Sequence, residues 1–216
     1  MTEGIPNSLM TASSAITADA LDALGVRDFA VSSRVKPLFD GARVVGRAYP
    51  VEVIVDLATP EQPYDGEMSA LSAMGSGDVG VYAVAASSRA AAWGELFSCA
   101  AIGRGVVGAL VDGCVRDRRQ IQKLGFPVFS VDVSPLDTMA RARVSSHGQP
   151  VLFGDVNVKK GDVVVADADG VVVVPAAKVL RVATFVGSKT RLEQGARDDL
   201  IAGLSIRAVW EKYGIF

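Results

Sequence analysis

Apolar residues follow two alternating patterns along this chain: short blocks rich in valine, and stretches in which they recur at helical spacing. Short apolar blocks bounded by Gly, Pro or Asp are typical of buried strands, whereas recurrence every three or four residues is typical of helices. We therefore predict strands over 34–39, 42–55, 79–86, 106–111, 128–133, 151–153, 156–158, 163–165 and 171–174. Helices are predicted over 9–24, 67–74, 94–103, 118–124, 176–194 and 198–213.

Two Asp-Gly pairs indicate turns between these elements. Asp40-Gly41 is expected to form a hairpin between strands 34–39 and 42–55, and Asp112-Gly113 to end strand 106–111. Strand–helix–strand units thus alternate with hairpins along the chain. This order predicts a layered α/β domain with a mixed sheet and flanking helices, rather than a doubly wound Rossmann sheet.

Three further segments are predicted to connect strands and helices. The sequence ADADG at 166–170 is expected to be a second hairpin turn. Its Asp167 and Asp169 also resemble a metal-binding pair, but a turn between valine strands is the more common role of such a segment. Residues 57–66, with two prolines, are expected to form a loop near the site, and residues 134–150 to be polar and irregular.

Composition narrows the class of protein. The 216 residues, 50% hydrophobic and 21% charged, suffice for one domain over 1–216 with a sizeable core. A net charge of -2 argues against a nucleic-acid partner. The N-terminal segment lacks the features of a signal peptide, and no run approaches the ~18 apolar residues of a membrane span. A cytoplasmic protein without membrane contact is expected.

Several isolated motifs are given structural roles. Residues 75–80 and 103–108 both match G-x-G-x-x-G, but each follows a helix and precedes a strand, the reverse of a dinucleotide site. They are predicted to be turns, and the same order counts against a methyltransferase with a Rossmann-type cofactor site. His147 is the only histidine and is expected to be a solvated loop residue. Cys99 and Cys114 lie in apolar runs and are expected to be core residues.

The stretch 93–125 combines three features that suit a bound anion. Arg116-Asp117 follow a strand, and ligands of open α/β sheets gather at the carboxyl ends of strands. The helix that begins at Gly94 offers unpaired backbone N–H groups. An arginine fork suits a carboxylate, and an aspartate suits a hard divalent cation. Together they predict a site for a metal-bound carboxylate substrate.

Each of these residues also has a simpler structural explanation. Arg116 could be a surface arginine at the start of a helix, and Asp117 could be the N-cap of that helix. Glu95 could be a first-turn glutamate that interacts favourably with the helix dipole.

The spacing and its flanks resemble the RraA-like family, which includes divalent-metal 4-hydroxy-4-methyl-2-oxoglutarate aldolases. That family carries an acidic residue, twenty intervening residues and then Arg-Asp, here Glu95 and Arg116-Asp117. Segments that also fit are WGEL, VDGCVRD, GFPVF and, at 166–175, ADADGVVVVP. The resemblance covers about 17–180. It implies a swivelling β/β/α-type domain with helical N- and C-terminal arms, assembled as a homotrimer or homohexamer with the site at a subunit interface.

The resemblance also implies a function and the residues that perform it. A Mg²⁺ or Mn²⁺ ion at Asp117 would act as a Lewis acid on a small 2-oxo acid. Glu95 would orient a water on that metal, so the expected catalytic residues are Glu95, Arg116 and Asp117. The expected substrate-binding residues are Gly94, Glu95, Leu96, Phe97 and Arg116. The reactions implied are cleavage of 4-hydroxy-4-methyl-2-oxoglutarate or a relative to pyruvate, and decarboxylation of oxaloacetate.

Two positions bear on how far this reaction carries over. Gln120 stands where family aldolases usually have an acidic residue, which favours decarboxylation or binding over aldol cleavage. Family aldolases bring in a distal glutamate from another chain, for which Glu193 is the candidate here. Family members named RraA inhibit a ribonuclease by protein–protein contact, so a regulator without aldol turnover is the alternative function.

Overall fold

The computed structural model describes residues 4–59 and 61–215. Its helices are α1 (Asn7–Met10), α2 (Ser14–Ala23), α3 (Asp65–Ala73), α4 (Glu95–Gly103), α5 (Arg118–Leu124), the 3₁₀ turn η1 (Ala176–Lys178), α6 (Val179–Ile201) and α7 (Ile206–Tyr213). Its strands are β1 (Lys36–Pro37), β2 (Val44–Val55), β3 (Asp78–Val84), β4 (Gly108–Val115), β5 (Val128–Val133), β6 (Ala142–His147), β7 (Val151–Phe153), β8 (Val156–Val158), β9 (Val163–Asp167) and β10 (Gly170–Val174).

The main sheet is mixed, as predicted. Its order is β1-β5-β4-β3-β2-β9-β10, with β6 also paired to β2, and β7 and β8 form a separate two-stranded sheet. The four strands β2 to β5 run parallel to their neighbours, whereas β1, β6, β9 and β10 pair antiparallel. Parallel neighbours need crossover connections, which α3, α4 and α5 supply. The carboxyl ends of β3, β4 and β5 therefore meet at one edge, where ligands of such sheets bind.

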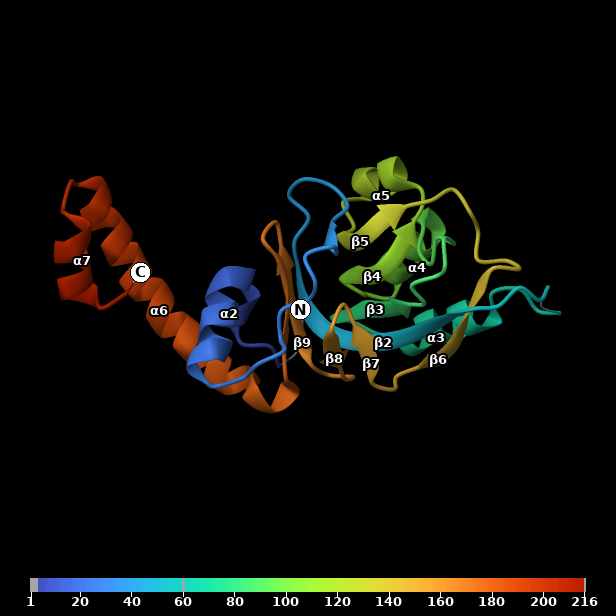
Figure 1. Cartoon of the computed structure of the whole chain (residues 1–216), viewed down its shortest axis with the longest axis horizontal. Helices are drawn as coiled ribbons and strands as arrows, with labels where there is room; N and C mark the ends of the chain where they lie inside the picture. Colours follow the sequence, from blue (N-terminus) through green and yellow to red (C-terminus); the bar gives the residue numbers. More distant parts are fainter. Residues whose placement is uncertain (1–3, 60, 216) are drawn as a thin grey trace.

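The helices fall into two groups at opposite ends of the molecule (Figure 1). The crossover helices lie around the parallel strands, and α2 packs between the sheet and the long helix α6. Apolar side chains of these helices contact β9 and β10 in one cluster, which includes Leu21, Val165, Val174, Val182 and Val186. The second half of α6 extends away from the sheet, and α7 folds back against it at the far end.

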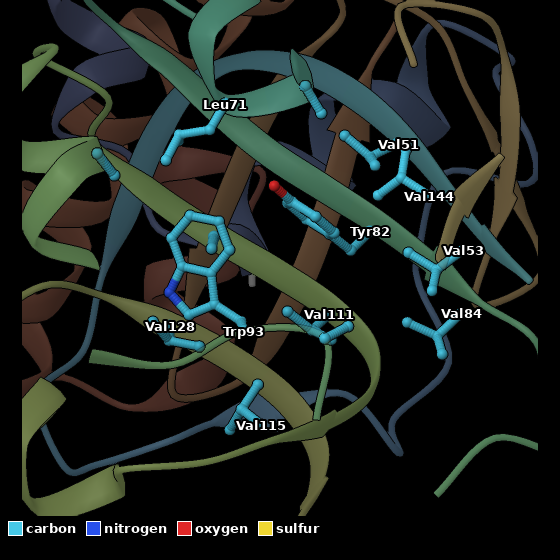
Figure 2. Close-up of a cluster of buried hydrophobic side chains, with 14 of the residues drawn as sticks. Val51, Val53, Leu71, Tyr82, Val84, Trp93, Val111, Val115, Val128 and Val144 are labelled. Carbon is cyan, nitrogen blue, oxygen red and sulfur yellow. The ribbon is translucent and has the colours of Figure 1, made fainter. Parts of the chain in front are cut away.

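An aromatic cluster fills the space between the parallel strands and the crossover helices. Trp93 is buried there and lies edge-on to Tyr82, with ring centroids 5.3 Å apart, and stacks on Phe126 at 6.0 Å. Figure 2 shows Trp93 and Tyr82 surrounded by valines of neighbouring strands, among them Val111 and Val128. Because Trp93 directly precedes Gly94, this packing fixes where α4 begins.

The predicted role of Asp112-Gly113 as a turn is wrong. Strand β4 continues through both residues to Val115, with a shift in its register against β5 after Val111. A side chain at Gly113 would place its Cβ atom 2.8 Å from the Cβ of Val84, so the glycine permits close strand packing. Asp112 instead accepts hydrogen bonds from both Arg34 nitrogens, Nε at 2.9 Å and Nη2 at 2.6 Å.

Two other predicted connections differ from the structure. The chain turns at Asp40-Gly41, but no hairpin forms among the described residues there, because β1 pairs with β5 while β2 lies three strands away. The predicted helix 9–24 is interrupted, because the Ser13 hydroxyl accepts from the Ile16 N–H and starts α2 anew. The polar segment 134–150 contains strand β6, which pairs with β2.

The isolated motifs have mixed outcomes. Both glycine motifs lie in turns, and 166–170 is the hairpin between β9 and β10, in which Asp167 accepts from the Ser14 N–H and hydroxyl. His147 lies at the end of β6 rather than in a loop, hydrogen-bonded to Tyr49 and Ser69.

The two cysteines differ in their exposure. Cys99 is exposed on α4, so its predicted core position is wrong, and Cys114 is partly buried. Among the helices of residues 4–59 and 61–215, none has the length and hydropathy to cross a membrane.

Candidate functional site

Arg116 and Asp117 occupy a tight connection between β4 and α5. The Arg116 N–H donates to the Trp93 carbonyl at 2.9 Å, which ties the end of β4 to the start of α4. Asp117 adopts a left-handed backbone with φ of 61°, a conformation that aspartate tolerates better than most residues. Its carbonyl accepts from the N–H groups of Gln120 and Ile121 and so begins α5.

The Asp117 side chain faces the N-terminus of α4 rather than that of its own helix. Asp117 stands at the N-cap position of α5 but makes no side-chain capping bond there. Its Oδ2 atom instead accepts from the Glu95 N–H at 3.2 Å. The spacing between Glu95 and the Arg-Asp pair therefore brings a helix N-terminus and a carboxylate together.

Arg116 is held by a second carboxylate, which the sequence analysis did not identify. Its Nη1 atom donates to Asp137 Oδ2 at 2.8 Å, and its Nε atom lies 3.8 Å from Asp117 Oδ2. The Tyr64 hydroxyl donates to the same Asp137 oxygen at 3.2 Å. The Arg116 side chain is still 38% exposed, and a guanidinium has five N–H donors, so donors remain for a ligand.

The surroundings of Asp137 keep it ionised. Burial acts to raise the pKa of its carboxyl group, but hydrogen bonds from the Met139 N–H and from Arg116 outweigh burial and hold the pKa below its usual range. The Arg116–Asp137 pair is therefore charged on both sides at neutral pH.

A cavity of about 780 Å³ opens beside these residues, between α3 and α4. Its apolar wall comes from the two helices and includes Met68, Leu71, Leu96, Phe97 and Ala100. The polar and charged side chains of its wall are Tyr64, Glu67, Ser72, Arg104, Arg116, Asp117, Asp137 and Thr138. Arg116 and Asp117 also border a smaller hollow of about 440 Å³ formed with Val133 and Pro135. The pair thus lies where a small anionic ligand has room to bind.

The predicted substrate-binding residues meet this cavity in different ways. Gly94 is the N-cap of α4 and has no side chain to cap the helix, and Gly94, Leu96 and Phe97 all line the cavity. The backbone N–H groups of Leu96 and Phe97 are thus in a position to bind a carboxylate. Glu95 contacts Asp117 through its backbone, but among the described residues its side chain does not line the cavity.

Two other predicted positions lie outside the cavity wall. Gln120 is exposed on α5 and is not among the described lining residues. Glu193 lies on the extended part of α6, paired with Lys189 at 3.8 Å (Figure 1). Within one chain Glu193 is remote from Asp117, so its predicted contribution would require a second subunit.

The sequence analysis missed Tyr64, Glu67 and Asp137. Tyr64 ends the loop 57–66 that was expected near the site, and its left-handed backbone begins α3. Asp137 lies in the segment 134–150, whose polar character gave no indication of the ion pair with Arg116. Glu67 lies on the buried face of α3, where an apolar residue is the usual occupant.

The donor set suits one kind of metal better than others. Among residues 4–59 and 61–215, no group of three or more His, Cys, Asp or Glu side chains could enclose a metal ion. That absence argues against a zinc site, which needs three or four protein ligands. Mg²⁺ retains several waters and binds through one or two carboxylates, so Asp117, which is partly exposed, fits Mg²⁺ or the similar Mn²⁺.

Gly94 is a sensitive position in this arrangement. A Cβ atom there would lie 2.9 Å from Asp117 Oδ2 and 3.2 Å from Arg116 Cγ, although the Gly94 backbone is extended and open to any residue. Gly94→Ala is therefore expected to displace both side chains and to lower turnover about tenfold, with little change in thermal stability. Gly103→Ala, at the other end of α4 with open space around it, is the control. Equal activity of the two variants would show that the position of Asp117 is not critical.

The fold and these contacts describe a layered α/β protein with an Arg-Asp pair and a polar cavity at the carboxyl ends of its parallel strands. The family model described as "RraA-like: Aldolase/RraA" matches residues 14–173, and the chain belongs to this family.

Two sequence relatives and one solved structure illustrate the similarity. A Halalkalibacterium halodurans protein named "Putative 4-hydroxy-4-methyl-2-oxoglutarate aldolase" is 30% identical over 90% of this chain and 88% of its own length. Legionella pneumophila protein DlpA is 24% identical over 95% of this chain, which spans only 33% of that protein. Streptomyces coelicolor RraAS2, described as an unusual member of the RNase ES inhibitor RraA protein family, has a TM-score of 0.80 and 26% identity, covering 90% of this chain and 96% of its own.

Proposed function

We propose that this protein is a divalent-metal-dependent lyase that cleaves 4-hydroxy-4-methyl-2-oxoglutarate, or a related 2-oxo acid, to pyruvate and also decarboxylates oxaloacetate. The observation that carries the proposal is the Arg116-Asp117 pair, held against the N-terminus of α4 in the wall of the large cavity. The name of the Halalkalibacterium halodurans relative supports the aldolase assignment.

The residues of the cavity have separate tasks in this proposal. Asp117 would hold Mg²⁺ or Mn²⁺, which supplies Lewis-acid polarisation of the 2-oxo group. The Leu96 and Phe97 N–H groups bind the substrate carboxylate next to that group. Arg116 donates to the oxygen on which negative charge develops, and Asp137 and Tyr64 keep the guanidinium in place.

The charge of the cavity wall suits a dianionic substrate. Its cationic side chains, among the described residues, are Arg104 and Arg116. Arg104 is anchored by the carbonyl groups of Ser72 and Met74, and so presents a second fixed positive charge. Both oxaloacetate and 4-hydroxy-4-methyl-2-oxoglutarate have two carboxylates, which two guanidinium groups can neutralise.

The test is pyruvate release from each of the two substrates by the purified chain, with Mg²⁺ and with a chelator in place of the metal. We expect release from both substrates only when Mg²⁺ or Mn²⁺ is present. No release from either substrate under any metal condition would overturn the proposal.

Position 120 offers a separate prediction. An acid there was expected to favour aldol cleavage, but Gln120 is exposed and does not line the cavity among the described residues. Gln120→Glu is therefore expected to change the ratio of cleavage to decarboxylation less than twofold, measured at matched Mg²⁺. A rise of fivefold or more in that ratio would place residue 120 in the reaction.

The alternative function is regulation through protein binding. The similarity to Streptomyces coelicolor RraAS2, whose description refers to a ribonuclease inhibitor family, favours this alternative. A regulator would inhibit an RNase E-type ribonuclease at stoichiometric concentration and would release no pyruvate. Assaying the same preparation for both properties distinguishes the two functions.

A further inference from the structure

Glu67 is a buried carboxylate in the wall of the candidate site. It belongs to the first turn of α3 and shares the buried face of that helix with Ala70 and Leu71. The residue is only 6% exposed, and it lines the same cavity as Arg116 and Asp117. Burying a carboxylate is costly unless another group stabilises it, so its presence on this face calls for a partner.

The described part of the protein supplies no such partner. No hydrogen bond or ion pair is formed by the Glu67 side chain within residues 4–59 and 61–215. Its closest electrostatic neighbours are two tyrosines. Burial first, and the Glu67 charge after it, raise the pKa of the Tyr82 hydroxyl, which itself has no hydrogen-bond partner among the described residues. Burial and Asp137 raise the pKa of Tyr64, with a smaller contribution from Glu67.

The other carboxylates of the described cavity wall are already engaged. Asp137 accepts from Arg116, Tyr64 and the Met139 N–H. Asp117 accepts from the Glu95 N–H and lies 3.8 Å from Arg116. Glu67 is thus the lining carboxylate whose oxygens remain available to a bound substrate.

We propose that Glu67 is the catalytic base for aldol cleavage, an assignment that rests on the proposed function. The Glu67 carboxylate takes the proton of the substrate's 4-hydroxyl group. The C3–C4 bond then breaks, C4 becomes the carbonyl carbon of one pyruvate, and the bonding electron pair stays on C3 to form the enolate of the second. Protonated Glu67 returns its proton to C3, so two pyruvates leave and the carboxylate is restored.

The two proposed reactions make different demands on this group. Decarboxylation of oxaloacetate breaks its C3–C4 bond with loss of CO₂ and leaves the same enolate, but there is no hydroxyl proton to remove. Loss of Glu67 should therefore impair cleavage much more than decarboxylation. The ratio of the two activities separates a base from a residue that only maintains the fold.

The test compares Glu67→Gln with wild type, using kcat/KM for both substrates at matched Mg²⁺ on the full chain. We expect Glu67→Gln to lower cleavage at least thirtyfold and to lower the cleavage-to-decarboxylation ratio at least tenfold. Asp65→Asn removes a carboxylate from the same helical turn at an exposed position, and both activities should stay within twofold. Glu67→Asp keeps a carboxylate and should retain more cleavage than Glu67→Gln.

Each outcome decides between the two proposals. An unchanged ratio in folded Glu67→Gln, or an equal fall of both activities, overturns the role of Glu67 and leaves the lyase intact. Should Glu67→Gln not fold, Glu67→Asp decides by the same ratio: a selective loss of cleavage supports the base, and a parallel loss overturns it. A wild type that decarboxylates but does not cleave also overturns the base, whereas a wild type inactive on both substrates overturns the proposed function itself.

Discussion

Asp117→Asn is expected to lower turnover of both substrates about a thousandfold, equivalent to ~4 kcal/mol of transition-state stabilisation. A neutral amide is a poor ligand for a hard cation, so the proposed metal site would lose its carboxylate. The fold should survive, because asparagine also tolerates the left-handed backbone that residue 117 adopts. Thermal unfolding of the variant is therefore expected to match wild type.

Metal binding provides a readout that does not depend on turnover. Mn²⁺ titration of the wild type should show a site that Asp117→Asn weakens at least tenfold. Asp132→Asn, an exposed substitution on the neighbouring strand β5, should leave both metal affinity and turnover unchanged. Equal Mn²⁺ affinity in wild type and Asp117→Asn would show that Asp117 is not a metal ligand.

The parts of the fold that follow local rules could be predicted from the sequence. Helix α5 and strands β5, β7 and β8 have the predicted bounds, since short apolar blocks between turn residues leave little choice of register. The approach of Arg116-Asp117 to Glu95 also follows from local order. A parallel crossover places the end of β4 beside the start of the helix that precedes it.

Features that depend on tertiary contacts could not be predicted in this way. Asp112-Gly113 has the composition of a turn, but close packing on Val84 and the ion pair with Arg34 keep it within a strand. Strand β1 forms only because β5 lies beside it, so no local pattern marks its partner.

The same limitation applies to the candidate site. Asp137 is 21 positions from Arg116, and Glu67 lies 50 positions before Asp117 in the chain. Their common cavity depends on how α3 and the segment after β5 fold over the edge of the sheet. Spacing along the sequence could therefore identify the Arg-Asp pair but not the carboxylates around it.

Arg116→Ala is expected to lower kcat/KM about a hundredfold, or ~3 kcal/mol, by two combined effects. The substrate loses a charged donor, and Asp137 loses the cation that keeps it ionised within the cavity wall. Arg116→Lys should recover little of this loss, because an ammonium cannot reach Asp137 and a substrate oxygen with the geometry of a planar fork.

The neighbouring arginine provides a matched control for this prediction. Arg118 is exposed at the start of α5 and does not line the cavity among the described residues, so Arg118→Ala should change kcat/KM less than twofold. A fall of less than threefold in Arg116→Ala would make Arg116 a surface residue. A full recovery in Arg116→Lys would show that only its charge matters. Since Asp137 keeps a low pKa partly through Arg116, Asp137→Asn should weaken catalysis less than Arg116→Ala, because the guanidinium stays near the substrate although it is less firmly held.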